Sequence, residues 1–144
     1  MINVLFVCTG NTCRSPMAEA LLKSRNLDGV EVRSAGIYAM EGQDASHHAK
    51  KVLEQAGICH QHTSRPISEA DAEWATYILT MTSSHKYALE NLYPAHREKV
   101  YTIKGFTGGK EGDVMDPFGG SRERYEETFR ELDEMIQRLA DKLN

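Results

Sequence analysis

Apolar residues occur in four short runs that predict β-strands, and segments with helical patterning separate these runs. The first run, residues 2–7, is continuous and rich in β-branched residues, as in a strand that is buried on both faces. The others are residues 30–34, residues 76–81 and the edge-like residues 99–103. Strands that alternate with helices predict an α/β fold with a mostly parallel sheet, whose ligands bind beyond the carboxyl ends of the strands.

Two helices are predicted in the first half of the chain. Residues 16–23 begin with a proline, whose φ angle suits a first helical turn, and continue with strong helix formers. Residues 47–56 lie between Ser46, a suitable N-cap, and Gly57, a common C-terminal stop. Each helix follows a predicted strand, as an α/β fold requires.

The chain after residue 57 predicts three more helices and a long loop. Residues 68–71 have the form of a capping box and open a short helix, and Ser83 or Ser84 caps the next one. Residues 104–120 are expected to form a glycine-rich loop, and loops of this length in a compact domain are usually functional. An amphipathic helix is predicted over residues 121–143. Its apolar stripe consists of Tyr125, Phe129, Leu132, Ile136 and Leu139.

Composition narrows the class of protein without changing this picture. The 144 residues, 40% hydrophobic and 26% charged, fit a single domain, residues 1–144. The net charge of −4 argues against a nucleic-acid-binding surface. No stretch approaches the roughly 20 apolar residues of a membrane span, and residues 1–7 are too short for a secretory signal. We therefore expect a cytoplasmic monomer without nucleic-acid or membrane partners.

Candidate chemistry lies in the octet Cys-Thr-Gly-Asn-Thr-Cys-Arg-Ser, residues 8–15, between the first strand and the first helix. At such a junction the free backbone N–H groups and the positive end of the helix dipole form a cradle for an anion. Gly10 and Asn11 suit this loop because they tolerate unusual or positive φ angles. Cys8 should ionise readily beside the cradle, and Arg14 offers a planar fork for two phosphate oxygens. The loop therefore predicts a nucleophile next to a phosphate clamp.

The spacing of Cys8 and Arg14 alone is weak evidence, because it recurs by chance and an inert buried cysteine would fit it equally well. Its place between a buried strand and a helix that starts with proline favours phosphate chemistry. A thiolate that displaces a phosphoryl group also needs a general acid for the leaving group. Asp116, followed by Pro117, is one candidate, and from the residues alone Asp113 is nearly as good. The alternative for either carboxylate is an ordinary solvated turn.

Residues 7–16, Val-Cys-Thr-Gly-Asn-Thr-Cys-Arg-Ser-Pro, resemble the signature of the low-molecular-weight protein tyrosine phosphatase family. The run Asp-Pro-Phe at residues 116–118 resembles that family's general-acid loop. This resemblance selects Asp116 over Asp113 as the general acid. Thr12 and residues 113–120 are most similar to the bacterial protein-arginine phosphatases. The resemblance spans nearly the whole chain. It implies a three-layer α/β/α fold with a central four-stranded parallel sheet, a relative of the flavodoxin-like fold.

The resemblance implies a cysteine-dependent phosphatase that hydrolyses phosphoarginine in proteins through a phosphocysteine. In this mechanism Cys8 attacks phosphorus, Arg14 and the loop amides stabilise the equatorial oxygens, and Asp116 protonates the leaving atom and then activates water. No metal or cofactor is required. The residues expected to contact the phosphate or the substrate are Thr9, Gly10, Asn11, Thr12, Cys13, Arg14, Ser15 and Phe118.

The resemblance also implies a set of residues that support the shape of the loop, namely Asn11, Ser15, Ser34 and His62. Without it, Asn11 is an ordinary turn residue, Ser15 is a plain serine at a helix start, and His62 is an ordinary loop histidine. A larger aliphatic residue commonly stands in the phosphotyrosine relatives where this chain has Thr12. The Thr12 hydroxyl could accept a hydrogen bond from a guanidinium group, although it could also merely pack the loop.

The three cysteines, Cys8, Cys13 and Cys59, are not expected to form a structural disulfide framework. Cys13 is instead expected to capture an oxidised Cys8 in a reversible disulfide, and the alternative is a small buried packing residue. Cys59 and four histidines match no closed zinc pattern, so no metal site is expected. The histidines are His47, His48, His60 and His62.

Three other functions remain open from the sequence. The nearest rival is the same chemistry on phosphotyrosine. An arsenate reductase would need further cysteines to relay a disulfide, whereas Cys59 is the only one outside the loop. A module that binds phosphorylated proteins without turnover would need neither Cys8 nor Asp116.

Overall fold

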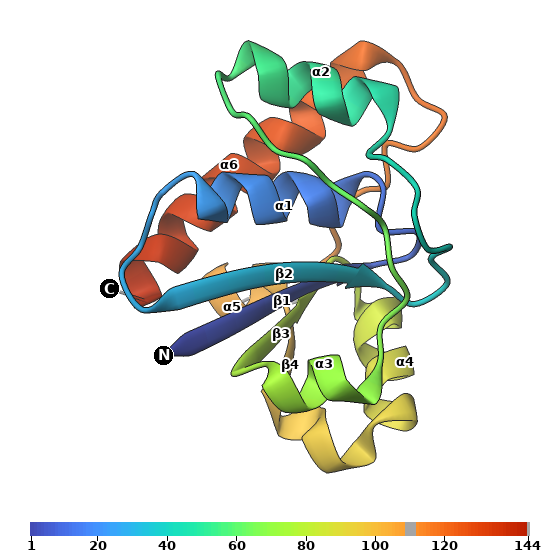
Figure 1. The fold of residues 1–144 in the computed structure, drawn as a ribbon, viewed down its shortest axis with the longest axis vertical. Helices are drawn as coiled ribbons and strands as arrows, with labels where there is room; N and C mark the ends of the chain where they lie inside the picture. The colour runs from blue at the N-terminus through green and yellow to red at the C-terminus, as the bar shows by residue number, and fades with distance from the viewer. Residues whose placement is uncertain (109–111, 144) are drawn as a thin grey trace.

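A computed structural model describes residues 1–108 and 112–143 of the protein (Figure 1). One sheet of four parallel strands has the order β2-β1-β3-β4, and the edge position of β4 agrees with the prediction. The strands are β1 (Ile2–Cys8), β2 (Val30–Gly36), β3 (Tyr77–Thr80) and β4 (Val100–Thr102). The predicted α/β fold with a four-stranded parallel sheet is confirmed.

Helices cover both faces of this sheet and complete three layers (Figure 1). In the view of Figure 1, α1, α2 and α6 lie above the sheet, and α3 and α4 lie below it. A short 3-10 helix, η1, follows α4, and α5 follows β4 and contacts α6. The bounds are α1 (Arg14–Lys23), α2 (His47–Gln55), α3 (Glu69–Trp74), α4 (Ser83–Leu92), η1 (Pro94–Lys99), α5 (Ile103–Gly108) and α6 (Arg122–Leu143).

Strand β1 connects the two hydrophobic cores. Phe6 and Cys8 belong to the larger core with residues of α1 and α6, whereas Leu5 and Val7 belong to the smaller core on the other face. Successive side chains of a strand point to opposite faces, so a continuous apolar run is what a strand covered on both sides needs. The strand thereby carries Cys8 to the carboxyl end of the sheet.

Several predicted helix ends are confirmed. The Ser46 hydroxyl accepts a hydrogen bond from the backbone N–H of Ala49 at the start of α2, and Gly57 beyond its end has a φ of +75°. The capping box of residues 68–71 is present at α3. In α6 the predicted apolar stripe is buried except for Phe129, which is only partly buried.

Two predicted starts of helices are wrong. Helix α1 begins at Arg14 instead of Pro16, which brings the arginine itself into the first turn. Helix α4 is capped by Thr82, whose hydroxyl accepts from the N–H of His85, so neither Ser83 nor Ser84 is the cap.

The prediction of a loop over residues 104–120 is wrong at its start, because residues 103–108 form α5. The Thr102 hydroxyl accepts a hydrogen bond from the N–H of Gly105, and Ile103 is fully buried. A cap and a buried anchor thus offset the poor helix propensity of glycine. Residues 109–111 of the predicted loop lie outside the described residues. Over residues 1–108 and 112–143, no helix has the length and apolar character needed to span a membrane.

Candidate active site

The loop that joins β1 to α1 turns sharply at Asn11, which is buried and has a φ of 57°. Gly10, the other residue expected to allow this turn, does not have a positive φ. Gly36 at the end of β2 passes so close that a Cβ there would lie 2.6 Å from the carbonyl oxygen of Thr9. The close approach explains why glycine ends that strand, since any side chain would displace the loop.

Cys8 lies at the end of β1 with its side chain almost completely buried. Its sulfur is 2.8 Å from the hydroxyl oxygen of Ser15 in the first turn of α1. The side-chain amide of Asn11 donates to that same oxygen at 2.8 Å. Because the Ser15 oxygen already accepts this bond, its hydrogen is available to the sulfur, where it would stabilise a thiolate.

Asn11 is the centre of the support network that the family resemblance implies. Its side-chain amide also donates to the Ser34 hydroxyl at 2.9 Å, and its side-chain oxygen accepts from the N–H of Arg65 at 3.1 Å. Its backbone oxygen lies 2.6 Å from Nε2 of His62. The structure therefore brings together all four predicted supports, two of which come from segments far from the loop in sequence.

Glu19 belongs to this network, although the sequence analysis did not include it. Its carboxylate accepts a hydrogen bond from Ser34 at 2.5 Å and forms an ion pair with Lys23 at 2.7 Å. Burial raises the pKa of this carboxyl, but its polar contacts, led by the one with His62, outweigh burial and lower the pKa to about 2. The spacing offered a signal, because residues 15 and 19 are four positions apart and share one face of α1.

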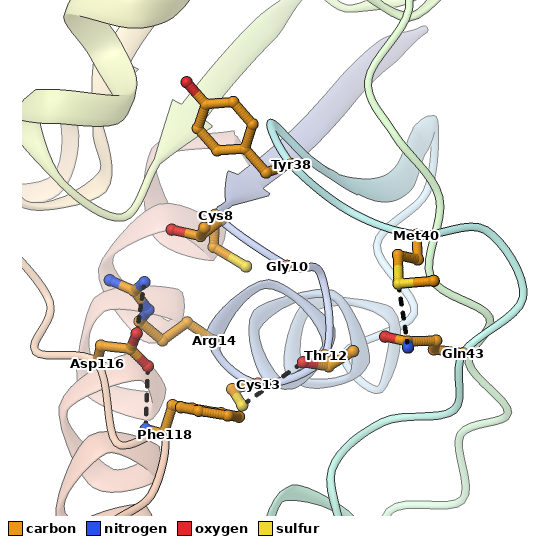
Figure 2. Close-up of a pocket in the computed structure, with 11 residues that line it drawn as sticks. Cys8, Gly10, Thr12, Cys13, Arg14, Tyr38, Met40, Gln43, Asp116 and Phe118 are labelled. Carbon is orange, nitrogen blue, oxygen red and sulfur yellow. Dashed lines mark hydrogen bonds and ion pairs between the residues drawn. The ribbon is translucent and has the colours of Figure 1, made fainter.

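Arg14 and Asp116 lie side by side at one side of the pocket (Figure 2). The Arg14 side chain is 5% exposed, and its Nη1 donates to the carbonyl oxygen of Val114 at 3.0 Å. Nη2 lies 3.5 Å from a carboxylate oxygen of Asp116, whose side chain is 50% exposed. The buried Nε of Arg14 has no hydrogen-bond partner among the described residues. The guanidinium thus has an N–H in reserve for a ligand.

The structure also separates Asp113 from Asp116, between which the residues alone did not decide and from which the family resemblance selected Asp116. Val114 lies between the two aspartates in sequence and is fully buried. Its carbonyl oxygen accepts a hydrogen bond from Arg14, and its N–H donates to the carbonyl oxygen of Met81, directly after β3. Asp113 lies on one side of this anchor, and its carboxylate accepts from the N–H of Ser83 at the start of α4. Asp116 lies on the other side and lines the pocket.

The pocket has a volume of about 320 Å³. Large exposed side chains surround its mouth, among them Tyr38, Met40 and Phe118. The N–H of Phe118 donates to the Asp116 carboxylate at 3.0 Å, so the two residues hold one turn together (Figure 2). The other lining residues are Cys8, Thr9, Gly10, Thr12, Cys13, Arg14 and Gln43. Of the predicted contact residues, Asn11 and Ser15 do not line the pocket and lie behind it.

Cys13 lines the same pocket as Cys8 and is buried. Its sulfur lies 3.5 Å from the Ser46 hydroxyl and 3.4 Å from the Tyr125 hydroxyl. Burial, and then the contact with Cys13, raise the pKa of Tyr125 to about 12, so this phenol is neutral at physiological pH. Cys59 is exposed and is not part of the pocket.

His85 on α4 is a neighbour of the loop that the sequence analysis did not identify. Its Nε2 lies 2.8 Å from the Thr9 hydroxyl, and its Nδ1 is buried without a partner among the described residues. Burial, and then repulsion from Arg14, lower the pKa of His85 to about 4. The imidazole is therefore neutral and adds no positive charge beside the cradle at pH 7.

These residues assemble a thiol, a buried cation and a half-exposed carboxylate at one cradle of backbone amides, which suits displacement of a phosphoryl group by sulfur. Within the described ranges, two groups of side chains lie close enough to hold a metal ion. One is Glu19, His60 and His62, and the other is Glu69, Glu73 and His96. Neither group contributes to the pocket.

Comparisons with known proteins agree over almost the full chain. The model of the family described as low molecular weight phosphotyrosine protein phosphatase matches residues 3–144. A protein-arginine-phosphatase of Geobacillus stearothermophilus is 51% identical over 140 residues, which cover 97% of this chain and 95% of the relative. The solved YwlE arginine phosphatase from Geobacillus stearothermophilus has a TM-score of 0.98 and 50% identity, covering 99% of this chain and 93% of that one. A solved mutant of a YwlE arginine phosphatase, with a phosphorylated active site serine, has a TM-score of 0.96 and 44% identity. The match covers 99% of this chain and 95% of that one.

Proposed function

The chain belongs to the low molecular weight phosphotyrosine protein phosphatase family, and we propose that it hydrolyses phosphoarginine in proteins through a phosphocysteine on Cys8. The observation that carries the proposal is that Cys8, Arg14 and Asp116 line one pocket at the end of β1. Cys8 is the nucleophile, Arg14 clamps the phosphate, and Asp116 is the general acid. The reaction requires no cofactor.

In the first step the Cys8 thiolate attacks phosphorus while the bond from phosphorus to the arginine nitrogen breaks. The electron pair of that bond goes to the nitrogen, which takes the proton of Asp116, so arginine leaves with its guanidinium group intact. The amides of residues 9–14 and the Arg14 guanidinium stabilise the charge on the equatorial oxygens. The hydroxyl of Ser15, 2.8 Å from the sulfur, stabilises the thiolate before attack.

In the second step water attacks the phosphocysteine. Asp116, now ionised, accepts a proton from the water, and the electron pair of the breaking bond between phosphorus and sulfur returns to Cys8 as a thiolate. Inorganic phosphate leaves with the added oxygen. The half-exposed position of Asp116 supports this role, because a solvent molecule can reach the carboxylate.

Two features support a guanidinium group as the leaving group. Thr12, which lines the pocket, carries a hydroxyl that can accept from a guanidinium N–H, and Asp116 can accept from a second one. Relatives named for arginine dephosphorylation are the more similar ones, at 51% and 45% identity, whereas a tyrosine phosphatase relative reaches 36%. Phosphotyrosine remains the second candidate substrate, because the description of the family names phosphotyrosine. The apolar side chains around the pocket mouth could also contact a phenyl ring.

The proposed setting is a single-domain monomer of residues 1–144 that acts in the cytoplasm on phosphorylated proteins. The net charge of −4 agrees with the expectation that nucleic acid is not a partner. Neither nucleic acid nor a membrane is a partner in the proposal.

The experiment that tests the proposal compares phosphate release from the same carrier protein phosphorylated on arginine or on tyrosine. We expect kcat/KM to be higher on phosphoarginine by at least about tenfold, which corresponds to roughly 1.4 kcal/mol of discrimination in the transition state. The Cys8→Ser variant is the blank for contaminating phosphatases. A preference for phosphotyrosine would establish the second candidate, and no release from either protein would refute the catalytic assignment.

A further inference from the structure

We infer that Glu19, His60 and His62 form a binding site for a divalent transition-metal ion of the Zn²⁺ type. Glu19 is on α1, and the two histidines are on the segment that follows α2, residues 56–68. One ligand atom from each side chain lies within 4.8 Å of the other two. The site is separate from the residues that line the pocket of Cys8, so the inference does not depend on the proposed function.

The distances are close to those of a coordinated metal ion. A carboxylate oxygen of Glu19 lies 3.8 Å from Nε2 of His60 and 3.6 Å from Nδ1 of His62. In tetrahedral zinc sites with ligands at about 2.0–2.2 Å, neighbouring ligand atoms are about 3.3–3.6 Å apart. The carboxylate oxygen is therefore within a few tenths of an ångström of that spacing from each nitrogen, and the two nitrogens lie within 4.8 Å of each other.

The strongest independent observation is the state of His60. Its side chain is only 7% exposed, and its buried Nε2 has no hydrogen-bond partner among the described residues. An unsatisfied polar nitrogen in a protein interior is costly and rare. Because this nitrogen points toward the Glu19 carboxylate, a cation bound between the two would satisfy both groups.

The hydrogen bonds around the cluster prepare the other two ligands. Nε2 of His62 lies 2.6 Å from the carbonyl oxygen of Asn11, which can only accept, so this nitrogen carries the hydrogen. In the neutral imidazole, Nδ1 then presents its lone pair to the Glu19 side. The Ser34 hydroxyl orients the same carboxylate oxygen. Outer contacts of this kind normally fix the orientation of metal-binding histidines and carboxylates.

The positive charge of Lys23 opposes the binding of a metal ion, and it provides a direct test of the site. The ammonium group of Lys23 lies 2.7 Å from the second oxygen of Glu19, and its positive charge disfavours another cation nearby. The competing arrangement is a direct polar contact between Glu19 and His62 without a metal ion, which would leave Nε2 of His60 without a partner. Only a metal site predicts that removing the Lys23 charge strengthens binding.

The test is a titration of Co²⁺, followed by Zn²⁺ competition, in the Cys8→Ser/Cys13→Ser protein, which lacks the loop thiols that could bind these ions. We expect one ion per chain and visible absorption of Co²⁺ in a low-symmetry protein site. His60→Gln should weaken the affinity at least about tenfold, as loss of metal-site residues does. Lys23→Met should strengthen it, and His47→Gln, a change at an exposed histidine, should leave it unaltered.

Thermal unfolding in the presence of a chelator checks that each variant is folded. Lys23 is 47% exposed, so its replacement keeps the test informative even if His60→Gln fails to fold. The absence of the Co²⁺ spectrum, or equal affinities of His60→Gln and His47→Gln, would overturn the inference. An affinity unchanged by Lys23→Met, or lost in Cys59→Ser but not in His60→Gln, would also place the ion elsewhere.

Discussion

The guanidinium of Arg14 and the carboxylate of Asp116 form an ion pair of 3.5 Å in the pocket, although one side chain is buried and the other is half exposed. Arg14 is held in place by the carbonyl of Val114, whereas Asp116 is held by the N–H of Phe118 within its own turn. A bound phosphate would compete with Asp116 for the guanidinium. Binding would then free the carboxylate to take up a proton from solvent, which it can deliver to the leaving group.

Replacement of the general acid should separate substrates by their leaving groups. We expect Asp116→Asn to lower kcat by about two to four orders of magnitude on poor leaving groups and by less on activated aryl phosphates, which need no proton. Asp113→Asn is the matched control, because that carboxylate contacts the start of α4 instead of the pocket. Equal losses on both kinds of substrate, or a larger loss in Asp113→Asn, would contradict the assignment.

Loss of the thiol should abolish turnover but preserve phosphate binding. In Cys8→Ser the loop amides and Arg14 remain, so we expect inorganic phosphate to bind with measurable heat in isothermal titration calorimetry while phosphate release stops. Cys59→Ser, at the exposed cysteine, should retain activity. Substantial turnover by purified Cys8→Ser would exclude Cys8 as the nucleophile.

Oxidation by peroxide should be reversible only while Cys13 is present. Both sulfurs line one pocket, so a sulfenic acid on Cys8 should be captured by Cys13 as a disulfide, which thiol reagents reduce. We expect wild type to recover most of its activity after peroxide and dithiothreitol, and Cys13→Ser to recover much less. Cys59→Ser serves as the control. Equal recovery of wild type and Cys13→Ser would indicate that Cys13 only packs the loop.

Replacement of Thr12 should change the substrate preference. Thr12→Ile removes the hydroxyl and adds bulk at the pocket, so we expect kcat/KM on phosphoarginine to fall by about one to two orders of magnitude. Activity on phosphotyrosine should be kept or increased. Thr12→Ser retains the hydroxyl and should stay close to wild type on phosphoarginine. A similar loss on both substrates in Thr12→Ile would point to a damaged loop.

Stability should fall with acidification because His85 is buried and neutral. Its pKa is about 4 in the folded protein against an ordinary value of 6.5, so between these values the unfolded chain binds a proton that the folded protein does not. The free energy of unfolding is then fully retained above pH 6.5 and falls towards pH 4, by roughly 3 kcal/mol in total. Urea unfolding from pH 7 to 4.5 should show a shallower pH dependence in His85→Gln. His47→Gln should keep the slope of wild type.

The sequence by itself determined the features whose parts are close together in the chain. One continuous stretch, residues 2–16, contains the apolar run of β1, the glycine and asparagine of the loop and Pro16 in the first turn of α1. The octet could therefore be placed at a strand end from its neighbours in the sequence alone. The caps at Ser46 and at residues 68–71 were predictable for the same reason, since a cap and its helix are adjacent. The family resemblance then supplied Ser34 and His62, which local patterns could not.

The family resemblance selected Asp116 over Asp113, but only the tertiary structure shows the contacts that separate them. Val114, between the two, is hydrogen-bonded to Met81 after β3 through its N–H and to Arg14 through its carbonyl. The same holds for Glu19 and His85, which read as an ordinary helical acid and an ordinary helical histidine until packing brings them beside the loop. Helix α5 was also hidden, since its glycines disfavour a helix and its stability comes from burial of Ile103. Hydrophobic periodicity and capping hydrogen bonds involve neighbouring residues, so they can be predicted from the sequence. Contacts between distant segments form only when the core packs, so the sequence pattern does not reveal them.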